Sequence, residues 1–176
     1  MGDSGYGIDV STINFISKEI KKIAILEYEV CLIIGGGNIF RGMKGASEGI
    51  DRSTSDYMGM LATIMNALSL QSCLEKIDLP TRVQSAISMS QIAEPYIKRK
   101  AVRHLEKKRI VIFAAGTGNP FFSTDTAASL RASEMNCSKI IKATKVDGIY
   151  DSDPNLNKNA NLIKEISYSE VINKNL

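Results

Sequence analysis

Residues 114–125 read AAGTGNPFFSTD and carry the densest grouping of polar, ligand-binding side chains in the sequence. The loop follows an apolar run at 109–114 that is typical of a buried strand, and it leads into a helix predicted at 125–135. Its two glycines allow a ligand to approach the backbone closely, and its hydroxyls and Asn119 offer hydrogen bonds. Strand-to-helix turns of this kind bind ligands in open α/β sheets, and the helix N-terminus favours anions. The first hypothesis is therefore that the loop binds a nucleotide or a phosphorylated small molecule.

A second glycine-rich turn, GGGNIFRG at 35–42, also follows an apolar run. Three consecutive glycines expose successive backbone N–H groups to phosphate oxygens, and Arg41 can add a bidentate contact. The alternative is a turn that only ends the strand, for which one glycine normally suffices. Two common phosphate motifs do not fit, because Met43 replaces the Walker lysine and Phe40 replaces the third Rossmann glycine.

Two further segments contribute polar candidates. Asp56 stands at the predicted start of a helix, where it either caps the helix or accepts hydrogen bonds from a ribose hydroxyl. Residues 142–154 form another strand-to-loop junction. There Tyr150 can stack on a base, while Thr144 or Asp153 can contact its ribose or phosphates. The alternative for this junction is a solvated turn rich in Asp and Asn.

Composition excludes several other classes of function. The 176 residues carry a net charge of only +3, which does not by itself indicate a nucleic acid or membrane partner. No apolar stretch approaches the roughly 20 residues needed to span a bilayer, and the N-terminus is not a signal peptide. The single histidine and the lack of a C-x-x-C spacing argue against zinc, and Leu156 and Leu162 break a calcium-loop pattern. We therefore expect a cytoplasmic protein without a dedicated metal site.

Strands and helices alternate along the sequence, which predicts an α/β fold with a mostly parallel open sheet and helices on both faces. One domain is expected over residues 1–176, since no linker or repeat divides the chain. Two helices show an apolar stripe at 3-4-3 spacing. The stripes are Ile13, Ile16, Ile20 and Ile23, and Met58, Leu61, Met65 and Leu68. The other predicted elements are strands at 28–34, 81–86, 110–114 and 139–144, helices at 94–108, 125–135 and from Ser167 or Ser169, and a loop at 147–161.

Four motifs taken together resemble the bacterial uridylate (UMP) kinases of the amino acid kinase superfamily. They are GGGNIFRG at 35–42, DYMGMLATIMN at 56–66, GTGNPFFSTD at 116–125 and ATKVDGIYDSDP at 143–154. The second and third are particular to the UMP kinases, and the resemblance runs from about residue 2 to the end. It implies transfer of the γ-phosphoryl group of ATP to UMP with Mg²⁺, giving UDP.

The same resemblance implies roles for individual residues. Catalytic roles fall to Asp125, Asp147 and Arg41. The implied ATP contacts are Gly37, Arg41, Thr144, Tyr150 and Asp153. The implied UMP contacts are Gly36, Asp56, Thr117, Gly118, Asn119, Pro120, Phe121, Phe122, Ser123 and Thr124. The implied loop for the effector GTP is Gly2, Asp3, Ser4, Gly5, Tyr6 and Gly7. UTP as an inhibitor and a homohexameric assembly are further implications.

One departure from the family pattern concerns the ends of the sequence. Members of the family carry Lys-Leu-Ser-Gly on a strand before the loop at 2–7, and they continue with further helix and strands after the last residue here. The domain is accordingly expected to be incomplete at both ends, and we expect little or no kinase turnover from this polypeptide as it stands.

Two other functions remain open from the sequence. One is a different superfamily phosphotransferase that acts on a carboxylate or carbamate, against which the motifs at 56–66 and 116–125 argue. The other is a non-catalytic regulator that binds UMP or UTP. Phosphorylation of UMP but not of glutamate analogues would argue against the first. Nucleotide binding without turnover, even in a full-length protein, would indicate the second.

Overall fold

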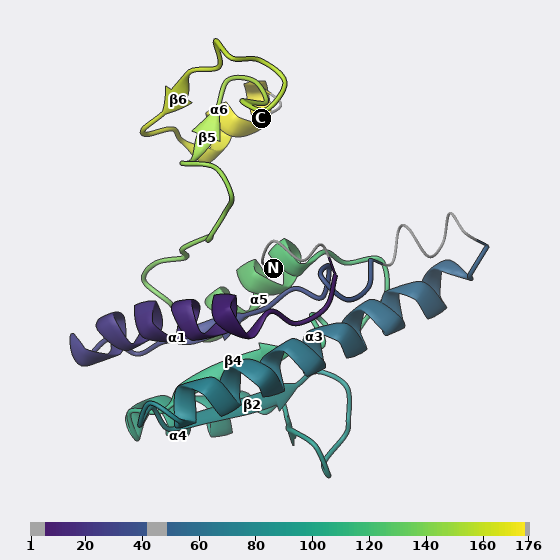
Figure 1. Cartoon of the computed structure of the whole chain (residues 1–176), viewed down its shortest axis with the longest axis vertical. Helices are drawn as coiled ribbons and strands as arrows, with labels where there is room; N and C mark the ends of the chain where they lie inside the picture. Colours follow the sequence, from purple (N-terminus) through teal and green to yellow (C-terminus); the bar gives the residue numbers. More distant parts are fainter. Residues whose placement is uncertain (1–5, 42–48, 175–176) are drawn as a thin grey trace. The chain divides into compact units, whose positions relative to one another are not determined.

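The computed structural model describes residues 6–41 and 49–174, and Figure 1 shows their path. The chain divides into two compact units, Met1–Ile140 and Ile141–Leu176, which are described separately below. The expected single domain over the whole chain stays a prediction.

The first unit is built on a parallel four-stranded sheet. Its strands are β1 (Cys31–Ile33), β2 (Thr81–Ser85), β3 (Glu94–Pro95) and β4 (Ile110–Ala114), in the order β1-β4-β2-β3. Leu32 pairs with Ile112 of β4, and Val83 pairs with Ile112 from the other side. Because β1 and β4 are parallel neighbours, the loops that follow them leave from the same edge of the sheet.

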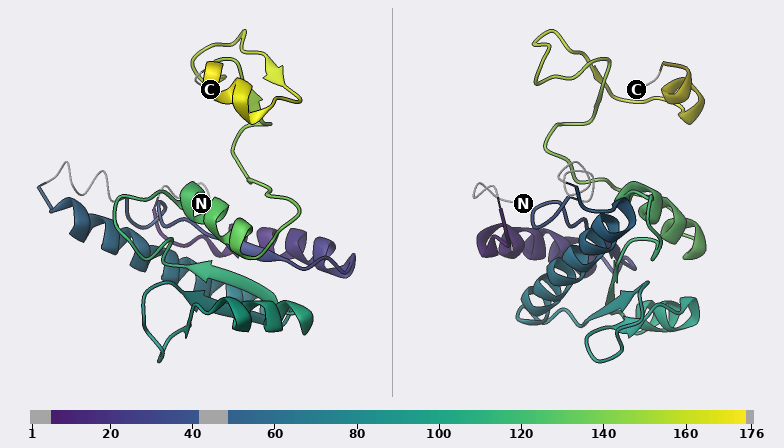
Figure 2. Two further views of the ribbon diagram at one scale, coloured as in Figure 1. Left: turned by 180° about the vertical axis from the view of Figure 1, so that it is seen from behind. Right: turned by 90° about the vertical axis from the view of Figure 1, so that its right-hand side faces the viewer.

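Helices cover both faces of this sheet, which confirms the predicted fold class. Ile110 and Ile112 of β4 are buried in one core cluster with side chains of α1 (Val10–Ile25) and α3 (Arg52–Glu75). The alternate residues Val111 and Phe113 face a second cluster, with side chains of α4 (Lys98–Glu106) and Met135 after α5 (Thr124–Glu134). Figure 1 and Figure 2 show α1 and α3 side by side over the sheet and α4 on its other side. The two-residue period of a strand explains this division.

The helix α3 differs from its sequence prediction in both its start and its inner face. It begins at Arg52, where the side chain of Asp51 accepts a hydrogen bond from the N–H of Thr54 at 3.0 Å. Asp56 therefore lies inside the helix, and the predicted capping position was wrong. The predicted stripe is also wrong, because Leu61 and Met65 are about half exposed while Ile64, Ala67 and Leu74 are buried. The helix carries apolar residues on several faces, so periodicity did not identify the buried one.

Smaller corrections concern sheet edges and helix ends. Only Cys31–Ile33 of the run at 28–34 is a strand, and Tyr28 is exposed. Glu94–Pro95 forms β3 instead of the first turn of the predicted helix at 94–108, so Ile97 becomes the exposed N-cap of α4.

No strand forms at 139–144, where two isoleucines are flanked by lysines and lie exposed without a strand partner. In α1 the side chain of Asp9 caps the helix by accepting from Ser11 N–H, and Ile23 of the predicted apolar stripe is exposed.

A buried cationic side chain fixes α5 to the sheet. Arg131 is only 6% exposed, and its guanidinium lies 3.7 Å from the centre of the Tyr96 ring. Glu134 accepts hydrogen bonds from Arg131 at 2.6 Å and from the Tyr96 hydroxyl at 2.7 Å. Tyr96 in turn meets Phe113 of β4 edge to face. These contacts hold the helix that follows the loop at 115–123.

The second unit is small and largely exposed. Its strands β5 (Ile149–Tyr150) and β6 (Leu162–Ile163) pair antiparallel, so the predicted loop at 147–161 is partly strand. Asp151 accepts a hydrogen bond from Asn161 N–H at 2.9 Å, which closes this hairpin. The helix α6 (Tyr168–Lys174) begins after Ser167, as predicted. Within residues 6–41 and 49–174, no helix is both long and apolar enough to cross a membrane.

Candidate functional site

One face of α3 contacts both glycine-bearing loops. Asp56, Gly59, Thr63 and Asn66 follow one another at 3-4-3 spacing, so they lie along a single face of the helix. Each of them contacts a residue of the turn after β1 or of the loop after β4. The N-terminal half of α3 therefore serves as a common support for the two loops that the sequence singled out.

The glycine triplet is seated directly on the α3 backbone. A Cβ on Gly36 would lie 2.6 Å from the carbonyl oxygen of Gly59 and 2.8 Å from the Cβ of Ala62. Gly36 is buried, whereas Gly37 is exposed. The Nε–H of Arg41 donates to the carbonyl oxygen of Gly37 at 3.2 Å, so the Arg41 side chain folds back over the triplet. This close packing against α3 explains why position 36 requires glycine, and phosphate binding by the triplet stays a prediction.

The loop after β4 has an unusual backbone. Ala115, Gly116, Gly118 and Phe121 all have positive φ values, and two of these residues are not glycine. Positive φ is strained for an L side chain, so such residues persist only where their surroundings fix them. Within the loop, the Thr117 hydroxyl accepts from the Asn119 N–H at 3.2 Å. Phe121 and Phe122 remain mostly exposed, with their rings available for contact.

Asp56 connects this loop to α3. Its Oδ2 accepts hydrogen bonds from the backbone N–H of Phe121 at 2.8 Å and from Arg52 at 2.9 Å. The Arg52 guanidinium also lies 5.7 Å from the centre of the Phe121 ring. Burial acts to raise the pKa of Asp56, but the Phe121 N–H and Arg52 outweigh it, so this pKa lies below its usual value. Asp56 is thus an ionised carboxylate beside the loop.

The start of α5 meets the glycine triplet. Ser123 caps the helix by accepting from Thr126 N–H at 3.1 Å. A Cβ on Gly35 would lie 3.6 Å from the hydroxyl oxygen of Thr124, which is ordinary contact distance. The helix N-terminus with Ser123, Thr124 and Asp125 therefore lies against the turn after β1, and its partial positive charge favours an anion there. The two loops predicted to bind phosphates are brought together.

Other predicted site residues belong to the second unit or to the N-terminal loop. Asp147, Thr144, Tyr150 and Asp153 belong to the second unit. Of the predicted effector loop, Gly2, Asp3, Ser4 and Gly5 lie outside the described residues. Gly7 has positive φ, and its backbone N–H donates to the backbone carbonyl oxygen of Asn38 at 2.7 Å. Tyr6 is largely exposed.

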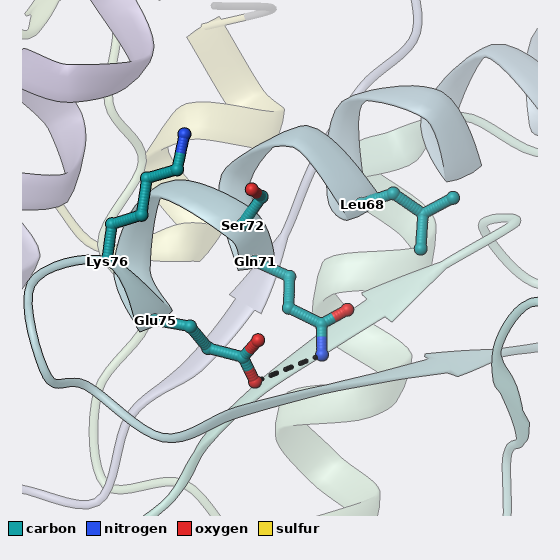
Figure 3. Close-up of a pocket in the computed structure, with 5 residues that line it drawn as sticks. All are labelled: Leu68, Gln71, Ser72, Glu75 and Lys76. Carbon is teal, nitrogen blue, oxygen red and sulfur yellow. Dashed lines mark hydrogen bonds between the residues drawn. The ribbon is translucent and has the colours of Figure 1, made fainter.

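A hollow lies farther along α3. Figure 3 shows it at the C-terminal half of the helix, where Gln71 donates to Glu75 at 3.4 Å. Its lining residues are Leu68, Gln71, Ser72, Glu75 and Lys76. None of these residues hydrogen-bonds to the glycine triplet or to loop 115–123, so the hollow is separate from the site described above.

Sequence reasoning missed three residues that hold the loops. Asn38 and Asn66 exchange amide hydrogen bonds at 2.6 and 3.0 Å, and the Thr63 hydroxyl accepts from Ala115 N–H at 2.7 Å. Thr63 and Asn66 continue the 3-4-3 spacing that starts at Asp56 and Gly59, but this spacing alone does not show which face of the helix is buried. Polar residues at such positions are unexpected in a buried helix face unless they have partners.

Comparison with known proteins gives three consistent matches. The model of the amino acid kinase family matches residues 2–175. A uridylate kinase of Cereibacter sphaeroides strain ATCC 17023 is 57% identical over 176 residues, which are the whole of this chain and 72% of the relative. A uridylate kinase of Roseobacter denitrificans is 56% identical over the same length, which is 73% of that relative. This chain thus spans somewhat under three quarters of the length of these relatives.

Solved structures show the same similarity. The crystal structure of UMP kinase from Ureaplasma parvum matches with a TM-score of 0.92 at 38% identity, over 100% of this chain and 74% of that one. The UMP kinase from Bacillus anthracis matches with a TM-score of 0.93 at 40% identity, over 99% of this chain and 72% of that one.

Proposed function

Because the chain belongs to the amino acid kinase family, we propose that it transfers the γ-phosphoryl group of ATP to UMP and releases UDP. The observation that carries this proposal is the meeting of the glycine triplet, loop 115–123 and the start of α5 on one face of α3. Its support from relatives is the 57% identity to a uridylate kinase over the whole chain. No observation favours a carboxylate substrate or a purely regulatory role.

UMP is proposed to lie along residues 117–124, with its phosphate toward the glycine triplet. Asp56 supplies an ionised acceptor for ribose hydroxyl groups, which fits its lowered pKa. The exposed rings of Phe121 and Phe122 offer apolar surface to the nucleoside. The backbone N–H groups of Gly36 and of the first turn of α5 supply donors to phosphate oxygens.

ATP is proposed to bind on the other side of the triplet. Gly37 is exposed and Arg41 folds over it, so both are available to phosphate oxygens. Thr144, Tyr150 and Asp153 are the proposed contacts to the rest of ATP, as the resemblance to the UMP kinases implies. Asp125 and Asp147 are proposed to organise the transfer centre between the two nucleotides.

The chemistry of the transfer matches these groups. A phosphate monoester has its second pKa near 6, so the attacking oxygen of UMP is already ionised at neutral pH and needs no general base. Rate acceleration then depends on alignment and on neutralising the charge of the transferring group. Backbone donors, the Arg41 guanidinium and the α5 N-terminus provide positive potential for this purpose.

Mg²⁺ is proposed to enter with the phosphates of ATP. No group of three or more His, Cys, Asp or Glu suited to hold a metal occurs in the part of the chain that the structure describes. Mg²⁺ is commonly bound by one or two carboxylates together with substrate phosphates, and Asp125 and Asp147 are the candidates. When bound, it would neutralise charge on the phosphoryl oxygens.

Assembly, regulation and location are also proposals. Tyr57, Leu61 and Met65 of α3 are exposed apolar residues, which supports association through this surface. A homohexamer is the assembly proposed, as the resemblance to the UMP kinases implies. We propose GTP and UTP as effectors, a cytoplasmic location, and a role in pyrimidine nucleotide synthesis. Nucleic acid and membranes are not proposed as partners.

A transfer assay with ³¹P NMR detection tests the function. The chain is incubated with ATP, Mg²⁺ and either UMP, CMP, glutamate or carbamate, and UMP binding is measured separately by calorimetry. The proposal expects saturable UMP binding and, where phosphate is transferred, UDP as the product. Phosphorylation of a carboxylate or carbamate, or no binding of UMP, would contradict it. UMP binding with no transfer, both in this polypeptide and in a version with Lys-Leu-Ser-Gly restored before residue 2, would favour the regulatory role.

A further inference from the structure

The hydroxyl of Thr63 has two hydrogen-bond partners within the protein. It donates to the carbonyl oxygen of Met60 at 2.7 Å, as threonine often does inside a helix. It also accepts from the backbone N–H of Ala115 at 2.7 Å, across 52 residues of sequence. Thr63 is 6% exposed and Ala115 is fully buried, so water does not compete for this bond. Leaving the Ala115 N–H without a partner would therefore be costly.

The bond from Ala115 lies where the loop backbone is strained. Ala115 and Gly116 have successive φ values of 62° and 57°, and Ala115 carries a side chain that disfavours this region. Thr63 satisfies the N–H of the first of these residues and so holds the loop at the point where it leaves β4. The direction taken by residues 116–122 depends on this point.

Asn66 holds the other loop from the next turn of the same helix. Its side-chain amide donates to the carbonyl oxygen of Gly35 at 2.8 Å and to Oδ1 of Asn38 at 2.6 Å, and it accepts from Asn38 at 3.0 Å. Asn66 is 5% exposed. Asn38 also donates to the carbonyl oxygen of Gly7 at 2.8 Å. The glycine triplet is thereby attached to α3 at both of its ends.

We propose that Thr63 and Asn66 are positioning residues that set the separation between loop 115–123 and the glycine triplet. This inference rests on the proposed function, in which the two loops bind the phosphates of two nucleotides. Neither side chain needs to touch a nucleotide. Since Thr63 and Asn66 are neighbours on a rigid helix, a shift of either loop away from α3 changes the gap that a phosphate must fit. Misplacement by about 1 Å is enough to weaken alignment strongly.

Substitution of Thr63 provides the first test. Thr63→Val keeps the shape of the side chain but removes the acceptor, and Thr63→Ser restores it. Ile64→Val is the matched control, because Ile64 is buried in the core of the same helix turn. We expect Thr63→Val to weaken UMP binding about 10-fold and to speed hydrogen exchange of the Ala115 amide by a similar factor. Thr63→Ser and Ile64→Val are expected to stay close to the wild type in UMP affinity and in exchange of the Ala115 amide, although Ile64→Val lowers the melting temperature.

A double-mutant cycle tests the second residue. Asn38→Ala and Asn66→Ala each remove the paired amide contact, and each also removes one bond of its own, to Gly7 and to Gly35 respectively. Because the paired contact is lost in both, the loss of UMP affinity in the double variant should be clearly smaller than the sum of the two single losses. All measurements are made at a temperature where circular dichroism shows each variant to be folded. Unchanged UMP affinity in Thr63→Val, an equal loss in Ile64→Val, or fully additive losses in the cycle would overturn the proposal.

The exchange measurement separates this inference from the proposed function. It is made without nucleotide, so it reports on the loop even if the wild-type chain does not bind UMP. In that case the kinase assignment fails, and the positioning role is judged by exchange at Ala115 alone. If Thr63→Val leaves that exchange unchanged, the positioning role fails whatever the nucleotide affinity.

Discussion

The carboxylate of Asp56 accepts a hydrogen bond from the backbone N–H of Phe121 at 2.8 Å, although 65 residues separate them in the sequence. Asp56 lies on α3 and Phe121 in the loop after β4, where it has a φ of 70°. The same carboxylate oxygen accepts from Arg52 at 2.9 Å. One acidic side chain thus joins the proposed acceptor loop to the helix that also supports the glycine triplet.

Replacement of Asp56 by alanine should weaken UMP binding by about 10- to 100-fold, because it removes a charge-assisted hydrogen bond worth about 1.5–3 kcal/mol and releases the Phe121 N–H. The affinity for ATP should change by less than about threefold, since no described contact joins Asp56 to the Gly37 or Arg41 region. Calorimetry with each nucleotide measures both values. Asp51→Ala is the control, because it removes the cap of the same helix without touching loop 115–122. An equal loss of UMP affinity in this control would show that helix stability alone is responsible.

The pH dependence of stability provides a second test of Asp56. Its pKa in the folded state is lowered, because the bonds from Phe121 and Arg52 outweigh the opposing effect of burial. The group therefore contributes stability at pH values above the unfolded pKa of about 3.9, and this contribution disappears as the pH falls through the folded value. Urea unfolding of the wild type and Asp56→Asn should give curves that converge on acidification. A constant difference between the two proteins down to pH 2 would contradict the assignment.

Addition of a methyl group to the glycine triplet should have an effect that depends on position. Gly36→Ala places a Cβ 2.6 Å from the Gly59 carbonyl oxygen, so we expect a loss of about 1–3 kcal/mol in unfolding free energy. Gly35→Ala and Gly37→Ala meet only side-chain atoms, at 3.6 Å and at 3.4 Å respectively, and should cost less than about 1 kcal/mol. Urea unfolding of the three variants measures the difference. Equal losses at all three positions would mean that the triplet is not seated on α3 in solution.

The Tyr96 hydroxyl should ionise only at strongly alkaline pH. Burial, and then the neighbouring Glu134 carboxylate, raise the pKa of Tyr96 to about 12. A raised pKa contributes stability that is complete below the unfolded value near 10 and is lost as the pH rises through 12. Tyr96→Phe should cost about 1 kcal/mol at pH 7, and that difference should shrink between pH 10 and 12. Absorbance titration at alkaline pH, compared between the wild type and Tyr96→Phe, follows the Tyr96 phenolate. Ionisation of Tyr96 by pH 10.5 would be inconsistent with its burial beside Glu134.

The cysteines should react at very different rates. Burial, with a smaller contribution from the neighbouring Cys137, raises the pKa of the Cys31 thiol to about 12, whereas the Cys137 side chain is exposed. Since the thiolate is the reactive form, maleimide at pH 8 should label Cys137 first and Cys31 far more slowly. Mass spectrometry of digests from the wild type and Cys137→Ser measures both rates. Rapid labelling of Cys31 in the variant would show that β1 is open to solvent.

The sequence was sufficient to predict the fold class and the two loops. The apolar run at 110–114 identified the central strand β4, because its residues are buried on both faces. The neighbouring strand at 81–86 was predicted as a short strand after Pro80, although its sequence is mostly polar. The inward face of α3 was not predictable, since apolar residues occur around much of its circumference and Thr63 and Asn66 lie buried among them. Which face of such a helix is buried depends on contacts with residues far away in the sequence, and these contacts cannot be read from a single sequence.

The roles of Thr63, Asn66 and Arg131 were missed for a related reason. Each is a polar or charged residue whose burial depends on partners far away in the sequence, at Ala115, Asn38 and Tyr96. Local pattern assigns such residues to an exposed face. The short strand β3 was missed because Glu94–Pro95 is too brief to show any period, and pairing with Gln84 and Ser85 defines it.

Backbone NMR during a UMP titration tests the central claim most directly, because the claim is that loops 35–41 and 115–122 form one site on α3. We predict that the amide signals of both loops shift together, with one common dissociation constant, and that Asp56→Ala moves that constant for both. Shifts confined to one loop, or two unrelated constants, would show that the loops do not act on the same nucleotide.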